Sequence, residues 1–139
     1  MTMHASDARY VRQTRFAPLG IEGQAGLARG LAVICGCGAL GTTAADLLVR
    51  AGVGRVRIID RDLVGWTNLH RQVLFDEEDA RQAHPKALAA AEKLRAVNSQ
   101  VEIEAVTADD IQRVARRIFD RAKLHAAVVG PSLDDAEIE

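Results

Sequence analysis

The sequence predicts an α/β fold: a Rossmann-like open parallel sheet of about four strands, in the order 3-2-1-4, with helices on both faces. Two observations support this prediction. Apolar runs of strand length alternate along the chain with amphipathic stretches of helical length, as in strands joined by right-handed helical crossovers. A glycine loop, residues 36–41 with the pattern G-x-G-x-x-G, also separates the first predicted strand from the next helix.

Two short helices are expected before the sheet. Ser6 or Asp7 can cap the first, which extends to Arg15, and residues 21–29 form the second. The first strand then occupies residues 31–35. Because this run is apolar throughout, we expect a strand that is buried on both faces.

The helix after the glycine loop has apolar side chains at helical spacing, and we expect them to face the core. They are Leu40, Ala44, Leu47, Leu48 and Ala51. Gly52 is expected to end this helix as a left-handed cap. Residues 56–60 form the second strand, which completes the first strand–helix–strand unit.

The second half of the chain continues the alternation. A helix begins near Pro85, and residues 101–105 alternate apolar and acidic side chains, the pattern of an edge strand with one side in water. An amphipathic helix over residues 111–119 leads to a fourth apolar strand at residues 126–129. Because only ten residues follow that strand, we expect a single partial domain, residues 1–139, which is the N-terminal half of a fold whose C-terminal half is missing.

The composition is that of an ordinary globular protein. A net charge of −1 provides no electrostatic basis for binding nucleic acid or an anionic membrane surface. The N-terminus lacks the apolar core of a signal peptide and no apolar run could span a bilayer, so we expect a cytoplasmic protein. Cys35 and Cys37 are expected to pack under the turn, because they are poorly placed to bond each other and too few to complete a zinc site.

The glycine loop has the features of a phosphate cradle. Gly36 allows a sharp turn out of the strand, Gly38 lets the backbone approach a phosphate, and Gly41 lets helix and strand pack closely. Asp60 stands at the carboxyl end of the second strand, where a ribose hydroxyl would lie. Each feature also has a purely structural interpretation: a tight turn without a ligand for the loop, and a cap of the following turn for Asp60.

Lys86 is placed against the helix dipole. A lysine in the first helical turn faces the positive end of the macrodipole, which costs about 0.3–1 kcal/mol when the side chain is exposed. A bound polyphosphate would reverse that sign, because the helix amides and the ammonium would act on one anion. The alternative is a solvated lysine at the start of a surface helix.

Arg71 is expected in a loop at the carboxyl edge of the sheet, where open α/β sheets bind ligands. Its guanidinium can bind phosphate oxygens in two places, although a surface ion pair with Asp76 or Glu77 would explain it equally well. Asn68 and Gln72 are better interpreted as residues that fix the loop and contact the nucleotide than as acids or bases.

Short motifs along the chain occur in the order and near the spacing of one known family. They are Arg9-Tyr10-x-Arg12-Gln13, Gly23-Gln24, the loop Gly36–Gly41, Arg50-Ala51-Gly52-Val53-Gly54, Asp60-Arg61-Asp62, Asn68-Leu69-x-Arg71-Gln72, Leu74-Phe75 and Pro85-Lys86. From about residue 9 to residue 106, the chain therefore resembles the ubiquitin-activating-enzyme-like family of the ThiF/MoeB/HesA type.

The resemblance implies an ATP-dependent adenylyltransferase that activates the C-terminal glycine carboxylate of a ubiquitin-like protein, often a sulfur carrier. By position, the implied nucleotide contacts are Gly36, Gly38, Ala39, Gly41, Asp60, Asn68, Arg71, Gln72 and Lys86. Asp60 would hold the ribose, and Asn68, Arg71 and Lys86 the phosphates. The counterpart of Arg12 reaches the neighbouring subunit's phosphate, which implies a homodimer. Because the carboxylate is already ionised, these cations would stabilise charge rather than transfer protons.

The chain departs from the family pattern after the fourth predicted strand. Family members carry Asp-x-Thr-Asp there, and its second Asp binds Mg²⁺. In residues 129–135, Gly130 replaces the first Asp, and Asp134 fits the second with a slip of one position. Asp134 is therefore the candidate Mg²⁺ ligand.

Two alternatives to an active adenylyltransferase remain. A non-catalytic partner subunit would keep the fold and the dimer surface but lack chemistry, and the altered residues 129–135 favour it. An NAD-dependent oxidoreductase would suit the glycine loop and Asp60, but it would leave Arg71 and Lys86 unexplained.

Overall fold

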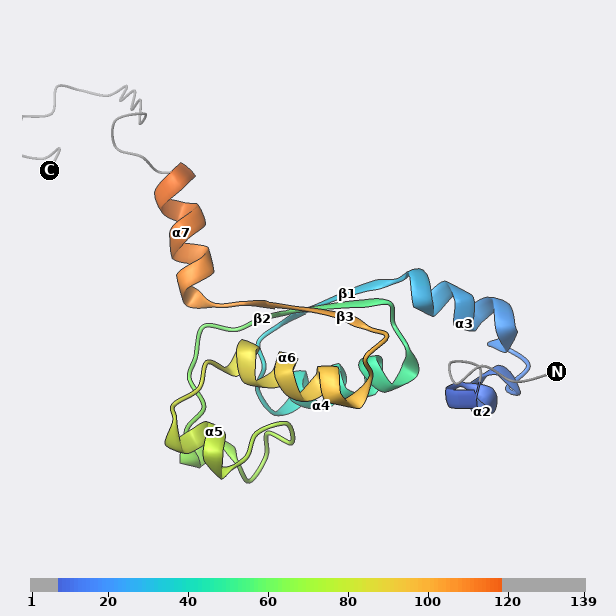
Figure 1. Cartoon of the computed structure of the whole chain (residues 1–139), viewed down its shortest axis with the longest axis horizontal. Helices are drawn as coiled ribbons and strands as arrows, with labels where there is room; N and C mark the ends of the chain where they lie inside the picture. Colours follow the sequence, from blue (N-terminus) through green and yellow to red (C-terminus); the bar gives the residue numbers. More distant parts are fainter. Residues whose placement is uncertain (1–7, 119–139) are drawn as a thin grey trace, which may run out of the picture.

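The computed structural model describes residues 8–118, which contain an open parallel sheet (Figure 1). Its strands are β1 (Leu31–Cys35), β2 (Arg55–Ile59) and β3 (Glu102–Val106), with β2 in the centre. Leu31 pairs with Arg55, and Arg55 with Glu102. The predicted α/β class with a parallel sheet is confirmed. These strands have the order 3-2-1, and the fourth strand expected at residues 126–129 lies outside the described residues.

Helices precede, connect and follow the strands. They are α2 (Val11–Thr14), α3 (Gly20–Arg29), α4 (Ala39–Ala51), α5 (Glu77–Arg81), α6 (Lys86–Val97) and α7 (Ala108–Ile118), with a 3-10 turn, η1, at Trp66–Asn68. The short helices expected before the sheet are present as α2 and α3, whereas the caps expected at Ser6 or Asp7 lie outside the described range. Between residues 8 and 118, no helix combines the length and the apolar character needed to cross a membrane.

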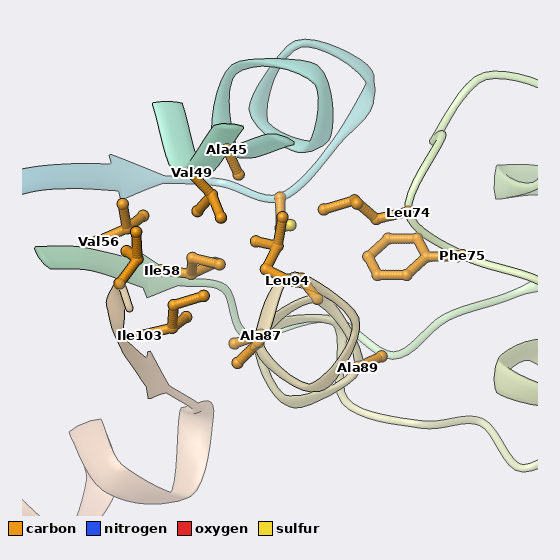
Figure 2. Close-up of a cluster of buried hydrophobic side chains, with 14 of the residues drawn as sticks. Ala45, Val49, Val56, Ile58, Leu74, Phe75, Ala87, Ala89, Leu94 and Ile103 are labelled. Carbon is orange, nitrogen blue, oxygen red and sulfur yellow. The ribbon is translucent and has the colours of Figure 1, made fainter. Parts of the chain in front are cut away.

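Helices α4 and α6 pack on the same face of the sheet (Figure 1). Both connect neighbouring parallel strands in the same direction across the sheet, and right-handed crossovers then place both on one side. Figure 2 shows the core between them, where Val49 of α4, Ile58 of β2 and Leu94 of α6 come together. All three side chains are fully buried.

The opposite face of the sheet is open in the described part of the chain. No helix packs across it there, and α7 borders only the carboxyl ends of β3 and β2. Leu31 and Val33 of β1 are therefore 50% and 51% exposed, which corrects the prediction that this strand is buried on both faces. The sequence predicted helices on both faces of the sheet. In residues 8–118, the crossover helices α4 and α6 lie on one face, because both crossovers run in the same direction across the sheet.

Helix α4 turns a different face to the sheet than the sequence predicted. Its fully buried side chains are Thr42, Ala45 and Val49. In the stripe predicted to be buried, Leu40, Ala44 and Leu47 are exposed, and only Leu48 packs against the core. The reason is the close approach of helix and loop: a Cβ added at Gly41 would overlap a backbone carbonyl. Small side chains therefore occupy the inner face at this end, and the leucines are left outside.

The N-terminal helices are fastened to the far end of α4. Gln13 of α2 and Gln24 of α3 each donate a side-chain hydrogen bond to the carbonyl oxygen of Ala51, at 3.1 and 2.9 Å. Tyr10 packs against Gly52, where a Cβ would leave no room for the ring. Gly52 has φ +84°, so the predicted left-handed cap is confirmed. The two glutamines of the sequence motifs thus bind the C-terminus of α4 rather than a ligand.

Candidate functional site

A cavity of about 560 Å³ opens where β1 ends and α4 begins. Its lining includes Cys35, Gly36, Gly38, Ala39, Arg71 and Gln72. Arg71 and Gln72 come from the long connection between β2 and α6, and the fold brings them to the glycine loop. From the sequence, we predicted only that these residues lie at the same edge of the sheet.

The glycines of the loop meet different requirements. Gly36 has φ +94°, a left-handed conformation, and its amide donates to the carbonyl oxygen of Ile59 at 2.8 Å. Gly41 is needed because a side chain would overlap the Gly36 carbonyl. Gly38 has no such need: a Cβ built there meets nothing within 4 Å. The open space in front of Gly38 is therefore available to a ligand.

The N-terminus of α4 borders this space. Gly38 is its N-cap residue, and no side chain caps the helix. The first amides of an α-helix have no partner within the helix, and the macrodipole adds positive potential at the same place. Because Gly38, Ala39 and Gly41 line the cavity, this end of α4 is suited to an anion such as phosphate.

Asp60 fastens the glycine loop to the end of β2. Its Oδ2 accepts a hydrogen bond from the amide of Cys37 at 2.5 Å, and its Oδ1 accepts one from the amide of Asp62 at 2.7 Å. The structural interpretation of this carboxylate, as a cap of the following turn, is therefore correct. Each carboxylate oxygen has a further lone pair, so a ribose contact stays a prediction that the geometry permits.

Lys86 is buried, which rules out the solvated lysine that the sequence left open. Its side chain is 8% exposed, and its Nζ lies 3.3 Å from Oδ2 of Asp62. The backbone amide of Lys86 also donates to the carbonyl oxygen of Asp62 at 2.9 Å. Sequence analysis gave Asp62 no role, although the motif Asp60-Arg61-Asp62 was the available signal.

Cys37 lies in the glycine loop, with its amide bound to the Asp60 carboxylate. It is fully buried, as predicted for a residue under the turn, whereas Cys35 is exposed. Burial, followed by the nearby Asp60 carboxylate, raises the pKa of Cys37 from 9.0 to about 12, while the Lys86 ammonium acts in the opposite direction. Burial and the Asp60 carboxylate therefore keep the Cys37 thiol protonated at neutral pH.

The connection after η1 holds the remaining candidates. Arg71 is exposed in the cavity wall, and Asp76 pairs instead with Lys93 at 2.6 Å, so the ion pair considered for Arg71 is not formed there. Gln72 is 2% exposed, and its Oε1 has no hydrogen-bond partner in residues 8–118. Asn68 does not line the cavity; its Oδ1 accepts from the amide of Gly65 at 2.9 Å and fixes the loop.

Arg12 is far from the cavity of its own chain. It lies on α2, next to Gln13, which binds the last residue of α4. The glycine loop is at the first residue of that helix, and 13 residues of α-helix span about 20 Å. Asp134, the candidate Mg²⁺ ligand, lies outside the described residues.

The fold and the site define a Rossmann-like α/β domain whose cavity is bordered by the uncapped N-terminus of a helix. The chain belongs to the ThiF family, whose match covers residues 10–134. It is 46% identical over 129 residues to the sulfur carrier protein ThiS adenylyltransferase of Bacillus subtilis, covering 93% of this chain and 37% of that protein. It is also 46% identical over 97 residues to the sulfur carrier protein adenylyltransferase of Thermus thermophilus, covering 70% and 35%.

Solved structures show the same similarity. The crystal structure of E. coli MccB with ATP matches with a TM-score of 0.64 and 29% identity, over 76% of this chain and 34% of that one. E. coli tRNA N6-threonylcarbamoyladenosine dehydratase, TcdA, matches with a TM-score of 0.66 and 26% identity, over 85% and 48%. The chain spans a little over a third of the length of the two curated relatives named above.

Proposed function

We propose that this chain forms the ATP-binding part of an adenylyltransferase, which activates the C-terminal glycine carboxylate of a ubiquitin-like sulfur-carrier protein. The observation that carries the proposal is the burial of Lys86 in the first turn of α6, where its ammonium contacts Asp62, two residues after Asp60. A buried ammonium at a helix N-terminus is unfavourable unless anions balance it. Lys86 has three N–H donors, and Asp62 accepts from one of them, so a phosphate can be bound as well.

The residues around the cavity fit a nucleotide. The amides of the glycine loop and the guanidinium of Arg71 would bind phosphate oxygens. Asp60 would hold the ribose, and Asn68 would keep the loop in place through its bond to Gly65. The unpartnered, buried Oε1 of Gln72 supports a ligand that supplies the missing donor, because buried polar atoms are rarely left without one.

The proposed reaction requires groups that stabilise negative charge on the phosphates. A carboxylate oxygen of the carrier protein forms a bond to the α-phosphorus, the bond between the α-phosphorus and the bridging oxygen breaks, and pyrophosphate leaves. The carboxylate is ionised at neutral pH, so no base is needed. Arg71 and Lys86 would lower the barrier by balancing the negative charge that gathers on the phosphates. We propose Asp134 as the ligand of Mg²⁺ and the cytoplasm, where ATP is available, as the location of the protein.

A homodimer is part of the same proposal. Arg12 lies on α2, whose Gln13 is bound to the last residue of α4, and the 13 residues of α4 that separate this point from the glycine loop span about 20 Å. A contribution from Arg12 to phosphate binding would therefore require a second copy, as the family resemblance implied. The described residues of a single chain leave one side of the cavity open to such a copy.

The test is a calorimetric titration of the full chain with ATP and, separately, with NAD. We expect ATP to bind and NAD to fail, and the reverse preference would overturn the proposal in favour of an oxidoreductase. The second candidate, a non-catalytic partner subunit, is favoured by Gly130, where the family carries Asp. A chain that binds ATP but does not exchange labelled pyrophosphate into it, with a ThiS-type carrier present, would be that subunit.

A further inference from the structure

Gln72 has a side-chain acceptor that no group in residues 8–118 satisfies. The residue is 2% exposed, and its Oε1 has no hydrogen-bond partner there. Its backbone is held at both ends: the amide donates to the carbonyl oxygen of Asn68 at 3.0 Å, and the carbonyl oxygen accepts from the amide of Phe75 at 3.1 Å. The side chain is therefore fixed at one place in the cavity wall, and a ligand that donates to it would remove the cost of an unpaired buried oxygen.

The other polar groups of this cavity are donors. Gly38 and Ala39 line it at the N-terminal end of α4, where helix amides are free, and the Arg71 guanidinium lies in the same wall. These groups suit phosphate oxygens. The ionised oxygens of a triphosphate only accept hydrogen bonds, so they cannot pair with Oε1 of Gln72. The Gln72 oxygen therefore needs a different group, one that carries an N–H or an O–H.

The ribose hydroxyls of a bound nucleotide belong on the other side of the glycine loop. Asp60, which is proposed to hold the ribose, lines a second cavity of about 290 Å³ together with Asp62. Gln72 is not part of that lining, and Gly36 is the residue that the two cavities share. A nucleotide with its ribose at Asp60 and its phosphates at α4 thus has its hydroxyls across Gly36 from Gln72.

The second substrate of the proposed reaction brings the missing donor. Its reacting end is a C-terminal glycine, whose amide nitrogen is two bonds from the carbon of the attacking carboxylate. When that carboxylate lies at the phosphates, the amide lies within the same cavity. We infer that the Gln72 side chain accepts a hydrogen bond from the amide of the carrier protein's C-terminal glycine, and so positions the carboxylate for attack. The inference rests on the proposed function.

The rest of the cavity wall is compatible with such a chain end. Ile34, Leu40 and Ala44 add apolar surface to it, against which a glycine without a side chain can lie. The last torsion of a glutamine side chain is broad, so the amide of Gln72 can turn its oxygen towards an incoming N–H. A site built to bond a donor discriminates against an analogue that lacks it, because its own polar group is then left unpaired. Gln72 would thus favour a peptide carboxylate over other carboxylates.

The test uses two forms of a ThiS-type carrier protein. One ends in glycine, and the other ends in glycolate, which replaces the last amide N–H by an ester oxygen. Calorimetry measures the affinity of each form for the full chain with a non-hydrolysable ATP analogue present. We expect the wild-type chain to bind the glycolate form about fivefold more weakly or worse, and Gln72→Met to bind both forms within about twofold of each other. Equal affinities in the wild type, or a preference kept by Gln72→Met, would overturn the inference.

A control variant and a stability measurement exclude a structural role. Gln82, at the end of α5, is exposed and bonds Glu78, so Gln82→Met should keep the wild-type preference for glycine. Because Gln72→Met replaces an unpaired buried amide by an apolar chain of similar length, its thermal midpoint should equal or exceed that of the wild type. A clearly lower midpoint would mean that the Gln72 amide bonds within its own chain, and it would contradict the inference.

The nucleotide titration separates this inference from the proposed function. A chain that binds no ATP analogue would overturn both. A chain that binds the analogue but neither carrier form, or both forms equally, would overturn the inference while leaving the nucleotide site in place. If Gln72→Met weakens the ATP analogue and keeps the preference for the glycine form, the side chain serves the nucleotide, and the inference is again overturned.

Discussion

Lys86 and Asp62 are joined twice, by the side-chain contact of 3.3 Å and by a backbone hydrogen bond of 2.9 Å. The adjacent pair, Leu63 and Pro85, forms an isolated antiparallel bridge. The start of α6 is thus fastened to the chain just after β2. This arrangement holds a buried cation against the carboxylate of Asp62, and it joins the Pro85-Lys86 motif to the Asp60-Arg61-Asp62 motif.

The first prediction concerns Asp62→Asn. The change removes the carboxylate that balances Lys86, so we expect the free energy of unfolding to fall by about 1–3 kcal/mol without ligand, as when a buried charge loses its partner. ATP should raise the thermal midpoint of the variant by more than it raises that of the wild type. The control is Asp46→Asn, whose partner Arg50 is exposed, and here the free energy of unfolding should stay close to that of the wild type. Equal losses in the two variants would contradict the role of Asp62.

A pair of glycine substitutions separates binding from folding. Gly41→Ala should destabilise the fold severely, because its Cβ would overlap the Gly36 carbonyl, and urea denaturation would show this. Gly38→Ala has an ordinary φ of −85° and open space around it, so we expect stability near that of the wild type. The added methyl should nevertheless weaken ATP about tenfold or more, since it fills the cradle. Full ATP affinity in Gly38→Ala would contradict the proposal that a phosphate binds in front of Gly38.

The cysteines should differ in reactivity. Thiolate is the reactive form, and burial raises the pKa of Cys37 to about 12, so at pH 8 a chromogenic disulfide reagent should label Cys35 and spare Cys37 until the chain unfolds. The sign of the pH effect follows from the same shift. The folded state keeps the Cys37 proton that the unfolded state loses near pH 9.0, so stability should fall as pH rises from 9 towards 12. Cys37→Ala should lose less stability over that range, and identical pH profiles would count against the shift.

The action of Arg12 in trans is tested by mixing two defective variants. Arg12→Ala keeps the cavity intact, and Lys86→Ala keeps the N-terminal helix intact. In an equal mixture, half of the dimers are hybrids with one complete site each, so about a quarter of all sites should recover wild-type ATP affinity. Each variant alone should show none. A mixture that binds no better than its components would mean that Arg12 does not cross to a second copy.

The sequence was most informative where local chemistry alone determines structure. The strand–loop–helix unit, the cap at Gly52 and the close packing at Gly41 follow from backbone conformation and size, and all of them are confirmed. The prediction of which face of α4 is buried was wrong. The helix has two apolar stripes with the same helical period, and which of them faces the sheet depends on how closely the helix approaches the loop. That distance is a tertiary property, which periodicity does not contain.

The candidate site divides in the same way. Glycine positions could be predicted, because their conformations are local. The burial of Lys86, its contact with Asp62 and the engagement of Asp60 by two backbone amides depend on how β2 and α6 meet. Arg12 could be placed near a phosphate only through the family resemblance, since its own chain holds it at the opposite end of α4.

The most direct test of the central claim is a calorimetric comparison of ATP with adenosine in Lys86→Ala. Lys93→Ala serves as the matched control, because Lys93 lies on the same helix but pairs with Asp76 and Asp79. We predict that Lys86→Ala weakens ATP by about 1.5–3 kcal/mol, the range for a charge-assisted hydrogen bond, while adenosine affinity is unchanged. Lys93→Ala should affect neither ligand. Equal losses for ATP and adenosine in Lys86→Ala, or no loss for either, would contradict a phosphate contact by the buried lysine.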